Sequence, residues 1–262
     1  MYMKTDHQKE CDEAGKGISR REALKTMGAV AVTAAAALSG VSALAACTPD
    51  DSKNNRKMKV LLLNGSPRKN GNTARMLTEV ANKLSEYGIG SEMAHIGNGA
   101  VRGCIACGQC RANNGRCVFD DDVCNGIISL MAECDAIVVG SPVYYGTPSG
   151  QVLCLLQRMA YAGGAVMQGK PAAAVTVCRR GGATAAFQTL QMPFQMLNMP
   201  IVTSQYWNIG YGAAEGEVSD DEEGLQTMRT LASNMAYMLQ QFASGSAKKP
   251  EREQWKTTNF IR

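Results

Sequence analysis

The chain has 262 residues, of which 27 are basic and 23 acidic, and its formal net charge is +4. This mild charge excludes the strong positive field of a nucleic-acid-binding domain, and the basic residues form no stripe along the sequence. The ten cysteines are many for a chain of this length, and they point to metal, redox or disulfide chemistry.

Residues 1–46 have the composition of an export signal. Arg20 and Arg21 lie in a polar stretch, and residues 26–46 then contain no charged residue. A basic segment followed by an apolar one is typical of secretory signals, and paired arginines are typical of the twin-arginine route. The Leu-Ala-Ala-Cys sequence that ends at Cys47 resembles a lipoprotein cleavage site. We therefore expect export and a lipid on Cys47 that anchors the protein to a membrane surface; an uncleaved transmembrane anchor is the alternative.

The remaining 216 residues suit one domain with a large core. We expect the lipidated cysteine and a polar linker at residues 47–57, a single α/β domain at 58–243, and a polar C-terminal tail at 244–262. The twin-arginine route, as known in general, carries folded proteins. Cysteines that fold inside the cell stay reduced, so this route weakens a disulfide interpretation.

Short apolar runs alternate with amphipathic stretches throughout the expected domain. Strands are predicted at residues 58–63, 90–96, 136–139, 172–177 and 201–206. Helices are predicted at residues 73–87, 123–133, 149–162, 183–198 and 220–242, and a cysteine-rich loop at 100–119. This alternation predicts a doubly wound, five-stranded parallel sheet, covered by helices on both faces, in the flavodoxin-like order 2-1-3-4-5.

The first predicted strand runs into a loop rich in hydrogen-bond donors, Asn-Gly-Ser-Pro-Arg-Lys-Asn-Gly-Asn-Thr, at residues 64–73. In a doubly wound sheet this position binds anions, because free N–H groups and the dipole of the following helix point at the ligand. Side-chain donors come from Ser66, Arg68, Asn72 and Thr73. The loop matches neither a dinucleotide fingerprint nor an NTPase loop. It therefore predicts a monophosphate such as FMN; a polar turn with a helix cap is the alternative.

Two more loops follow strands predicted to end at the same edge of the sheet. The sequence Gly-Ser-Pro-Val-Tyr-Tyr-Gly at residues 140–146 offers aromatic surface and backbone N–H groups to a flavin ring, or caps the sheet edge with two tyrosines. The candidate flavin-binding residues of this loop are Pro142, Val143, Tyr144, Tyr145 and Gly146. A weaker candidate is Cys-Arg-Arg-Gly-Gly at 178–182, which can meet the far side of the flavin or an anionic substrate.

Four cysteines, Cys104, Cys107, Cys110 and Cys117, lie within 14 residues. The first three recur at every third residue, so one tight loop can aim all three at a common point. This pattern favours a [4Fe–4S] cluster, which needs four converging thiolates. An all-cysteine zinc site, and free thiols or disulfides, are the alternatives. Four further cysteines lie in apolar segments and are interpreted as core residues: Cys124, Cys134, Cys154 and Cys178.

The first glycine-rich loop, the cysteine segment and the second glycine-rich loop, in this order, resemble the flavodoxin-like NADPH-dependent FMN reductases, and most closely their iron–sulfur flavoprotein branch. The resemblance covers residues 58–210. It implies that the first loop holds the FMN phosphate, that the second flanks the isoalloxazine, and that the four spaced cysteines bind [4Fe–4S]. The chain departs from the family on the third predicted helix, where Leu153 and Gln157-Arg158 replace the usual Lys and Asp-Arg.

We therefore expect an exported FMN-dependent oxidoreductase that passes electrons between a donor, FMN and a [4Fe–4S] cluster to a small-molecule or protein acceptor. The donor is NAD(P)H by the resemblance, or a quinol or redox protein, because NAD(P)H is scarce outside the cytoplasmic membrane. No side chain is nominated as a catalytic acid or base. A non-catalytic electron carrier, a lipid-anchored binding protein with structural cysteines, and a flavin reductase without a cluster are the alternatives. The resemblance also implies a homodimer or homotetramer.

Overall fold

The computed structural model describes residues 56–248, together with 250, 251, 253, 254, 256 and 258. The expected export signal and Cys47 lie outside the described residues. Within the described part of the chain, no helix is both long and apolar enough to cross a membrane.

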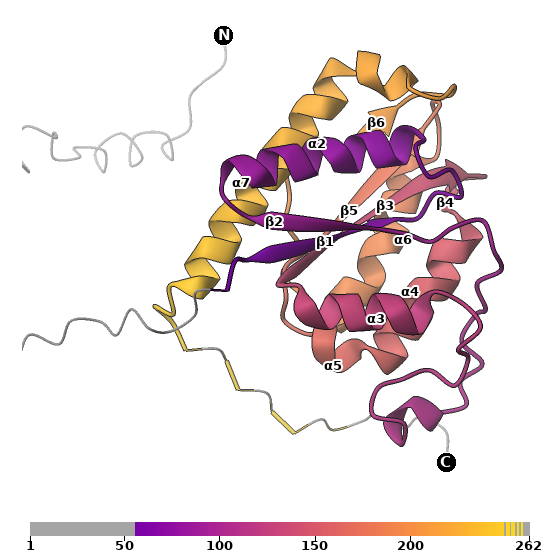
Figure 1. The fold of residues 1–262 in the computed structure, drawn as a ribbon, viewed down its shortest axis with the longest axis vertical. Helices are drawn as coiled ribbons and strands as arrows, with labels where there is room; N and C mark the ends of the chain where they lie inside the picture. The colour runs from indigo at the N-terminus through magenta and orange to yellow at the C-terminus, as the bar shows by residue number, and fades with distance from the viewer. Residues whose placement is uncertain (1–55, 249, 252, 255, 257, 259–262) are drawn as a thin grey trace, which may run out of the picture. The chain divides into compact units, whose positions relative to one another are not determined.

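A parallel sheet forms the centre of the fold, with the strand order β2-β1-β3-β5-β6 (Figure 1). Its strands are β1 (Lys59–Asn64), β2 (Gly90–His95), β3 (Ala136–Tyr144), β5 (Ala172–Cys178) and β6 (Ile209–Tyr211). The two-residue strand β4 (Thr147–Pro148) pairs antiparallel with the end of β3. Apart from this added hairpin, the order is the predicted one, so the doubly wound, flavodoxin-like prediction is confirmed.

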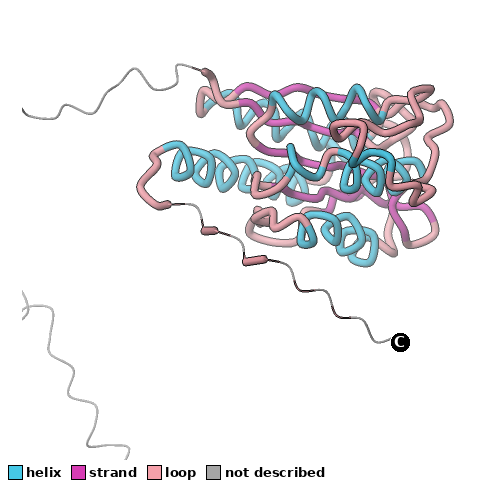
Figure 2. Tube along the Cα trace, turned by 90° about the horizontal axis from the view of Figure 1, so that it is seen from below, coloured by secondary structure: helices cyan, strands magenta, loops and turns pink. Residues whose placement is uncertain are grey.

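Helices cover both faces of the sheet (Figures 1 and 2). They are α2 (Asn72–Glu86), α3 (Cys124–Glu133), α4 (Gly150–Ala162), α5 (Gly164–Met167), α6 (Ala183–Met196) and α7 (Glu222–Ala243). Helices α2 and α7 pack on one face and the others on the opposite face. Strand β1 serves both cores, because Leu62 points to the first face whereas Leu61 and Leu63 point to the second. All three leucines are fully buried, as expected for a central parallel strand.

The last strand differs from the prediction for residues 201–206. Ile201 makes only an isolated bridge to the start of β5, and regular pairing begins at Ile209. Between these points the Asn208 side chain donates to the carbonyl of Ala174 at 3.0 Å, in place of a backbone group. Residues 201–206 have the composition of a strand, but an edge strand can leave the sheet when a side chain bonds the neighbouring strand instead.

Helix α2 lies unusually close to β3, and Gly140 makes this approach possible. A Cβ at Gly140 would lie 2.8 Å from Cγ2 of Thr73 and 3.0 Å from Cδ1 of Leu77. Contacts this short are rare in proteins, so a larger residue would force the Thr73 and Leu77 side chains, or the start of α2 itself, to shift.

We predict that Gly140→Ala lowers the free energy of unfolding by about 1–3 kcal/mol, because the added methyl group overpacks the α2–β3 contact. Gly126→Ala in α3 is the matched control, since a Cβ there meets nothing within 4 Å. This control should stabilise the protein by about 0.5–1 kcal/mol, as Ala does for Gly in an open helix position. Urea unfolding of both variants tests the pair. If both variants changed the free energy of unfolding in the same direction, the packing described here would be wrong.

Candidate functional site

The β1–α2 loop and the β3–α4 loop are held together at the carboxyl edge of the sheet. The N–H of Gly65 donates to the carbonyl of Gly140 at 2.8 Å, and the Ser149 hydroxyl donates to the carbonyl of Gly65 at 2.7 Å. A Cβ at Gly65 would lie 2.7 Å from that Gly140 oxygen, so the contact requires glycine. Ser149 also caps α4 by accepting from the N–H of Val152. The two loops that the sequence predicts to bind FMN are therefore neighbours.

Helix α2 begins where these two loops meet, and its N-cap residue is Gly71. Within the described part of the chain, this helix start has no side-chain cap. The first N–H groups have no partner within a helix, so they remain available to an anion. Arg68 is exposed in the same loop, whereas Thr73 is buried against β3. Free N–H groups, the helix dipole and a nearby guanidinium together form a site that suits a phosphate.

Two other predicted phosphate residues, Ser66 and Asn72, are engaged in shaping the loops. The hydroxyl of Ser66 accepts from the N–H of Arg68 at 3.1 Å, which leaves its own hydrogen for a ligand. The Asn72 amide binds the 213–218 segment instead, donating to Ala214 at 2.8 Å and accepting from Gly216 at 2.9 Å. Asn72 thus holds a neighbouring loop in place, and its role toward a phosphate stays a prediction.

His95, the one histidine among the described residues, also supports this loop. Its Nε2 lies 2.8 Å from the carbonyl oxygen of Ser66, in hydrogen-bond contact. The imidazole reaches the loop from the end of β2, next to β1 in the sheet. This contact was not apparent in the sequence, because it joins the end of β2 to a loop 29 positions earlier in the chain.

The second predicted flavin loop forms a tight hairpin between β3 and β4. Tyr145 has φ of 51° and Gly146 has φ of 80°, as a two-residue type I′ turn requires. A left-handed backbone is unfavourable for tyrosine, and the Tyr145 side chain is fully exposed. Tyr144 is 45% exposed, whereas Pro142 and Val143 remain half-buried in β3. Both aromatic rings are therefore free to contact a ligand.

The third predicted loop, residues 178–182, lies directly against this hairpin. Gly182 has φ of 84°, and a Cβ on it would lie 2.7 Å from Cα of Gly146. Arg179 and Arg180 are exposed beside this contact. Three loops that are distant in sequence thus gather at one edge of the sheet, as the strand order predicts.

The four spaced cysteines line a single cavity of about 730 Å³. The cavity lies beside the last turns of α4 and α6, where Tyr161 and Met196 contribute apolar surface. It is therefore separate from the three-loop edge. Every cysteine among the described residues is a free thiol, and no three Cys, His, Asp or Glu side chains there lie close enough to bind one metal ion. An iron–sulfur cluster sets a different requirement, because each thiolate binds its own iron.

Arg158 of α4 is the main support of the cysteine loop. Its side chain is almost fully buried, with 1% of its surface exposed. Its Nε donates to Sγ of Cys117 at 3.2 Å, and its Nη2 donates to the carbonyl of Phe119 at 3.0 Å. Its Nη1 donates to the carbonyl of Arg102 at 3.3 Å and to the carboxylate of Asp122. The guanidinium thus joins four points of the loop at once.

Asp122 and Arg158 form a buried ion pair whose charges are mutually stabilised. Burial alone would raise the pKa of Asp122, but hydrogen bonds from Arg158 and from the N–H groups of Cys124 and Arg102 hold this pKa below its usual value. Burial opposes the charge on Arg158, yet the bonds to Asp122 and Cys117 raise the pKa of its guanidinium. Both side chains therefore remain ionised inside the protein.

Asn125 fixes the backbone of the fourth cysteine from the other side. Its Oδ1 accepts from the N–H of Cys117 at 2.9 Å, and its Nδ2 donates to the carbonyls of Cys117 and Phe119 at 3.0 and 3.1 Å. The sequence did not predict these roles of Arg158, Asp122 and Asn125.

Three of the four remaining described cysteines are core residues, as predicted. Burial raises the pKa of the Cys124 thiol to about 11 and raises those of Cys134 and Cys178 as well. Such thiols stay protonated and unreactive at neutral pH. Cys154 is only half-buried on α4.

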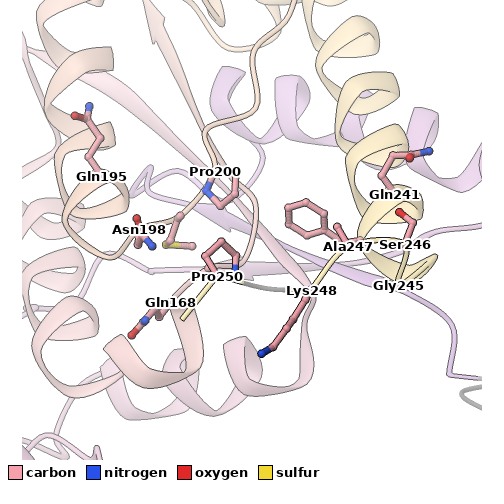
Figure 3. A pocket seen from close by; sticks show the side chains of 13 residues that line it. Gln168, Gln195, Asn198, Pro200, Gln241, Gly245, Ser246, Ala247, Lys248 and Pro250 are labelled. Atoms are coloured by element: carbon pink, nitrogen blue, oxygen red, sulfur yellow. The ribbon is translucent and has the colours of Figure 1, made fainter. Parts of the chain in front are cut away.

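A second cavity, of about 640 Å³, lies at the amino-terminal edge of the sheet, between the ends of α6 and α7. Figure 3 shows the amides of Gln195 and Asn198 on one side and that of Gln241 on the other. Because the three loops lie at the carboxyl edge, this cavity is remote from them. The sequence showed no pattern that predicts it.

We predict that Tyr145→Asn raises the free energy of unfolding by about 1 kcal/mol, since asparagine adopts a left-handed backbone more easily than tyrosine. The side chain is fully exposed, so its removal sacrifices little packing. Tyr144→Asn is the matched control: its backbone is not left-handed, and it should not stabilise the protein. Thermal unfolding distinguishes the two variants. Destabilisation by Tyr145→Asn would contradict this account, because it would mean that the exposed tyrosine makes stabilising contacts.

Comparison with known proteins identifies a family and several relatives. The model of the "NADPH-dependent FMN reductase" family matches residues 58–214. An iron–sulfur flavoprotein of Methanocaldococcus jannaschii is 34% identical over 190 residues, covering 70% of this chain and 97% of the relative. An iron–sulfur flavoprotein of Methanosarcina thermophila is 30% identical over 189 residues, covering 70% and 96%.

Solved structures share the fold at much lower identity. RosB superposes with a TM-score of 0.54 at 15% identity, covering 78% of this chain and 93% of RosB. The flavoenzyme FerB of Paracoccus denitrificans superposes with a TM-score of 0.50 at 18% identity, covering 70% and 98%. From its sequence relatives and its loop architecture, the chain belongs to the NADPH-dependent FMN reductase family, in the iron–sulfur flavoprotein branch, and is a flavin-dependent oxidoreductase.

Proposed function

We propose that this protein is an exported FMN-dependent oxidoreductase that carries electrons from a donor, through FMN and a [4Fe–4S] cluster, to a small-molecule or protein acceptor. The uncapped N-terminus of α2, beside the Gly65–Gly140 contact, is the observation that carries the FMN part of the proposal. The four cysteines that line one cavity support the cluster.

The residues present fit both groups. When bound, FMN supplies two-electron uptake with one-electron release, and a [4Fe–4S] cluster supplies a one-electron relay. Backbone N–H groups of the first α2 turn, the Ser66 hydroxyl and the Arg68 guanidinium would hold the phosphate. Tyr144, Tyr145 and the backbone of the hairpin would flank the ring system. Cys104, Cys107, Cys110 and Cys117 would supply the thiolates.

We predict that Arg68→Ala raises the Kd for FMN by about 10- to 100-fold, because a charged hydrogen bond to phosphate contributes about 1.5–3 kcal/mol. Lys69→Ala removes the same charge from the adjacent exposed residue and is the matched control. It should raise the Kd by less than about 3-fold, since an exposed lysine acts only through a screened field. Fluorescence titration of apoprotein with FMN measures both. Equal effects would indicate that charge alone, not the Arg68 fork, recognises the ligand.

We predict that replacing any of Cys104, Cys107, Cys110 or Cys117 by serine removes most of the iron and acid-labile sulfide from anaerobically purified protein. Cys154→Ser is the control, because Cys154 is comparably exposed but does not line the cavity. Metal and sulfide assays, with the absorption spectrum, give the readout. Zinc without sulfide, or protein that contains FMN but no metal, would contradict the cluster.

The proposed donor depends on the compartment. Export places the protein where NAD(P)H is scarce, so we propose that a quinol or a redox protein reduces the FMN. Anaerobic stopped-flow reduction compares NADPH with a soluble quinol analogue, and we expect the quinol to reduce the protein faster. Rapid reduction by NADPH alone would refute the extracytoplasmic donor while leaving the flavin site intact.

The export signal and a lipid on Cys47 support a membrane-surface location, and the resemblance supports a homodimer or homotetramer. Arg56, at the start of the described chain, donates to the carbonyl of Glu133 at 2.7 Å, beside the amino-terminal edge of the sheet.

A further inference from the structure

Among the four cavity cysteines, Cys117 has a distinct environment. Its Sγ accepts from a charged side chain, the Nε of Arg158, at 3.2 Å. The Sγ of Cys104 accepts only from a backbone N–H, that of Ala106, at 3.4 Å, and the Sγ of Cys110 itself donates to the carbonyl of Tyr161 at 3.6 Å. These three sulfurs are therefore electrostatically unequal.

We propose that Arg158 is a positioning residue that sets the reduction potential of the cluster through its N–H bond to Cys117. This inference rests on the proposed [4Fe–4S] cluster. Hydrogen bonds to cluster sulfurs are one of the means by which a protein adjusts the potential. A directed N–H dipole stabilises the reduced form more, because that form carries the greater negative charge, and so it raises the potential.

Asp122 fixes the direction of the N–H bond from Arg158 to Cys117. It binds Nη1 of the guanidinium and is itself held by the N–H groups of Arg102 and Cys124, each at 3.1 Å. Phe119 accepts from Nη2 through its carbonyl. With both terminal nitrogens fixed, Nε has no freedom to turn away from Cys117.

Because Arg158 is buried, its N–H bond to Cys117 affects the reduction potential more than its net charge does. Asp122 neutralises most of the guanidinium charge at short range, since both side chains are almost fully buried. The N–H dipole toward sulfur is not cancelled in this way and acts in a medium of low dielectric constant. Arg158→Lys is therefore the informative change: lysine keeps the charge opposite Asp122 but has no N–H at the position of Nε.

Arg116→Gln is the matched control. Arg116 precedes Cys117 directly and pairs with Asp120 at 2.6 Å, but both side chains are about half exposed and neither contacts a cysteine sulfur. This variant removes a full charge close to the cluster without removing an N–H bond to sulfur. Arg158→Gln removes charge and bond together, but it leaves Asp122 buried without its partner and so destabilises the fold; Arg158→Lys therefore carries the test.

The experiment is an EPR-monitored redox titration of the three holoproteins, wild type, Arg158→Lys and Arg116→Gln, after iron and sulfide have been assayed. We expect a lower midpoint potential in Arg158→Lys than in wild type, and a smaller change in Arg116→Gln. Selective failure of Arg158→Lys to load iron would also support the positioning role. A potential unchanged in Arg158→Lys, or changed no more than in Arg116→Gln, would overturn it. Wild type without iron and sulfide would instead refute the proposed cluster.

Hydrogen exchange of the apoproteins gives a readout that needs no cluster. The carbonyls of Arg102 and Phe119 are held by Arg158, so exchange across residues 117–122 should be faster in Arg158→Lys than in Arg116→Gln. Equal exchange in these two variants would show that Arg158 does not position the loop.

Discussion

The hydrogen bond from Gly65 to Gly140 is the contact on which the flavin edge depends. It requires glycine at position 65, because a Cβ there would lie 2.7 Å from the Gly140 carbonyl oxygen, whereas a Cβ on Gly140 would crowd the side chains of Thr73 and Leu77 on α2. The helices of this edge differ in how their first N–H groups are capped. Ser149 and Asp221 cap α4 and α7 with their own side chains, whereas α2 and α6 each start at a glycine, Gly71 and Gly182, without a side-chain cap. The first N–H groups of α2 therefore receive no bond from a capping side chain and can bind a ligand.

Helix α4 links the two regions where cofactors are proposed to bind. Its cap, Ser149, donates to Gly65 in the phosphate loop, and Arg158, two turns further along, binds Cys117. One rigid element therefore carries a support for each region, although the cysteine cavity lies beside the far end of the helix. The departure of this helix from the family pattern does not affect Arg158, which has its own partners within the chain. Its neighbour Gln157 lines the cysteine cavity.

Strand order, most helix positions and the gathering of three loops followed from the alternation of apolar runs, because a doubly wound sheet brings successive strand ends to one edge. The features that the sequence did not predict correctly are those set by tertiary contacts. The strand expected at 201–206 moved to Ile209–Tyr211 because the Asn208 side chain replaces a backbone partner. The Arg158–Asp122 pair was invisible because it joins residues 36 positions apart, across a loop without regular structure. Asn72 has the residue type of a phosphate ligand, yet its amide binds the neighbouring 213–218 segment.

The central claim is that the start of α2 recognises a phosphate group. The most direct measurement compares the Kd of the apoprotein for FMN with that for riboflavin, which has the same ring but no phosphate. Several charge-assisted hydrogen bonds of about 1.5–3 kcal/mol each predict that FMN binds at least ~100-fold more tightly. Equal affinities would mean that the ring alone is recognised, and would contradict a phosphate site at the N-terminus of α2.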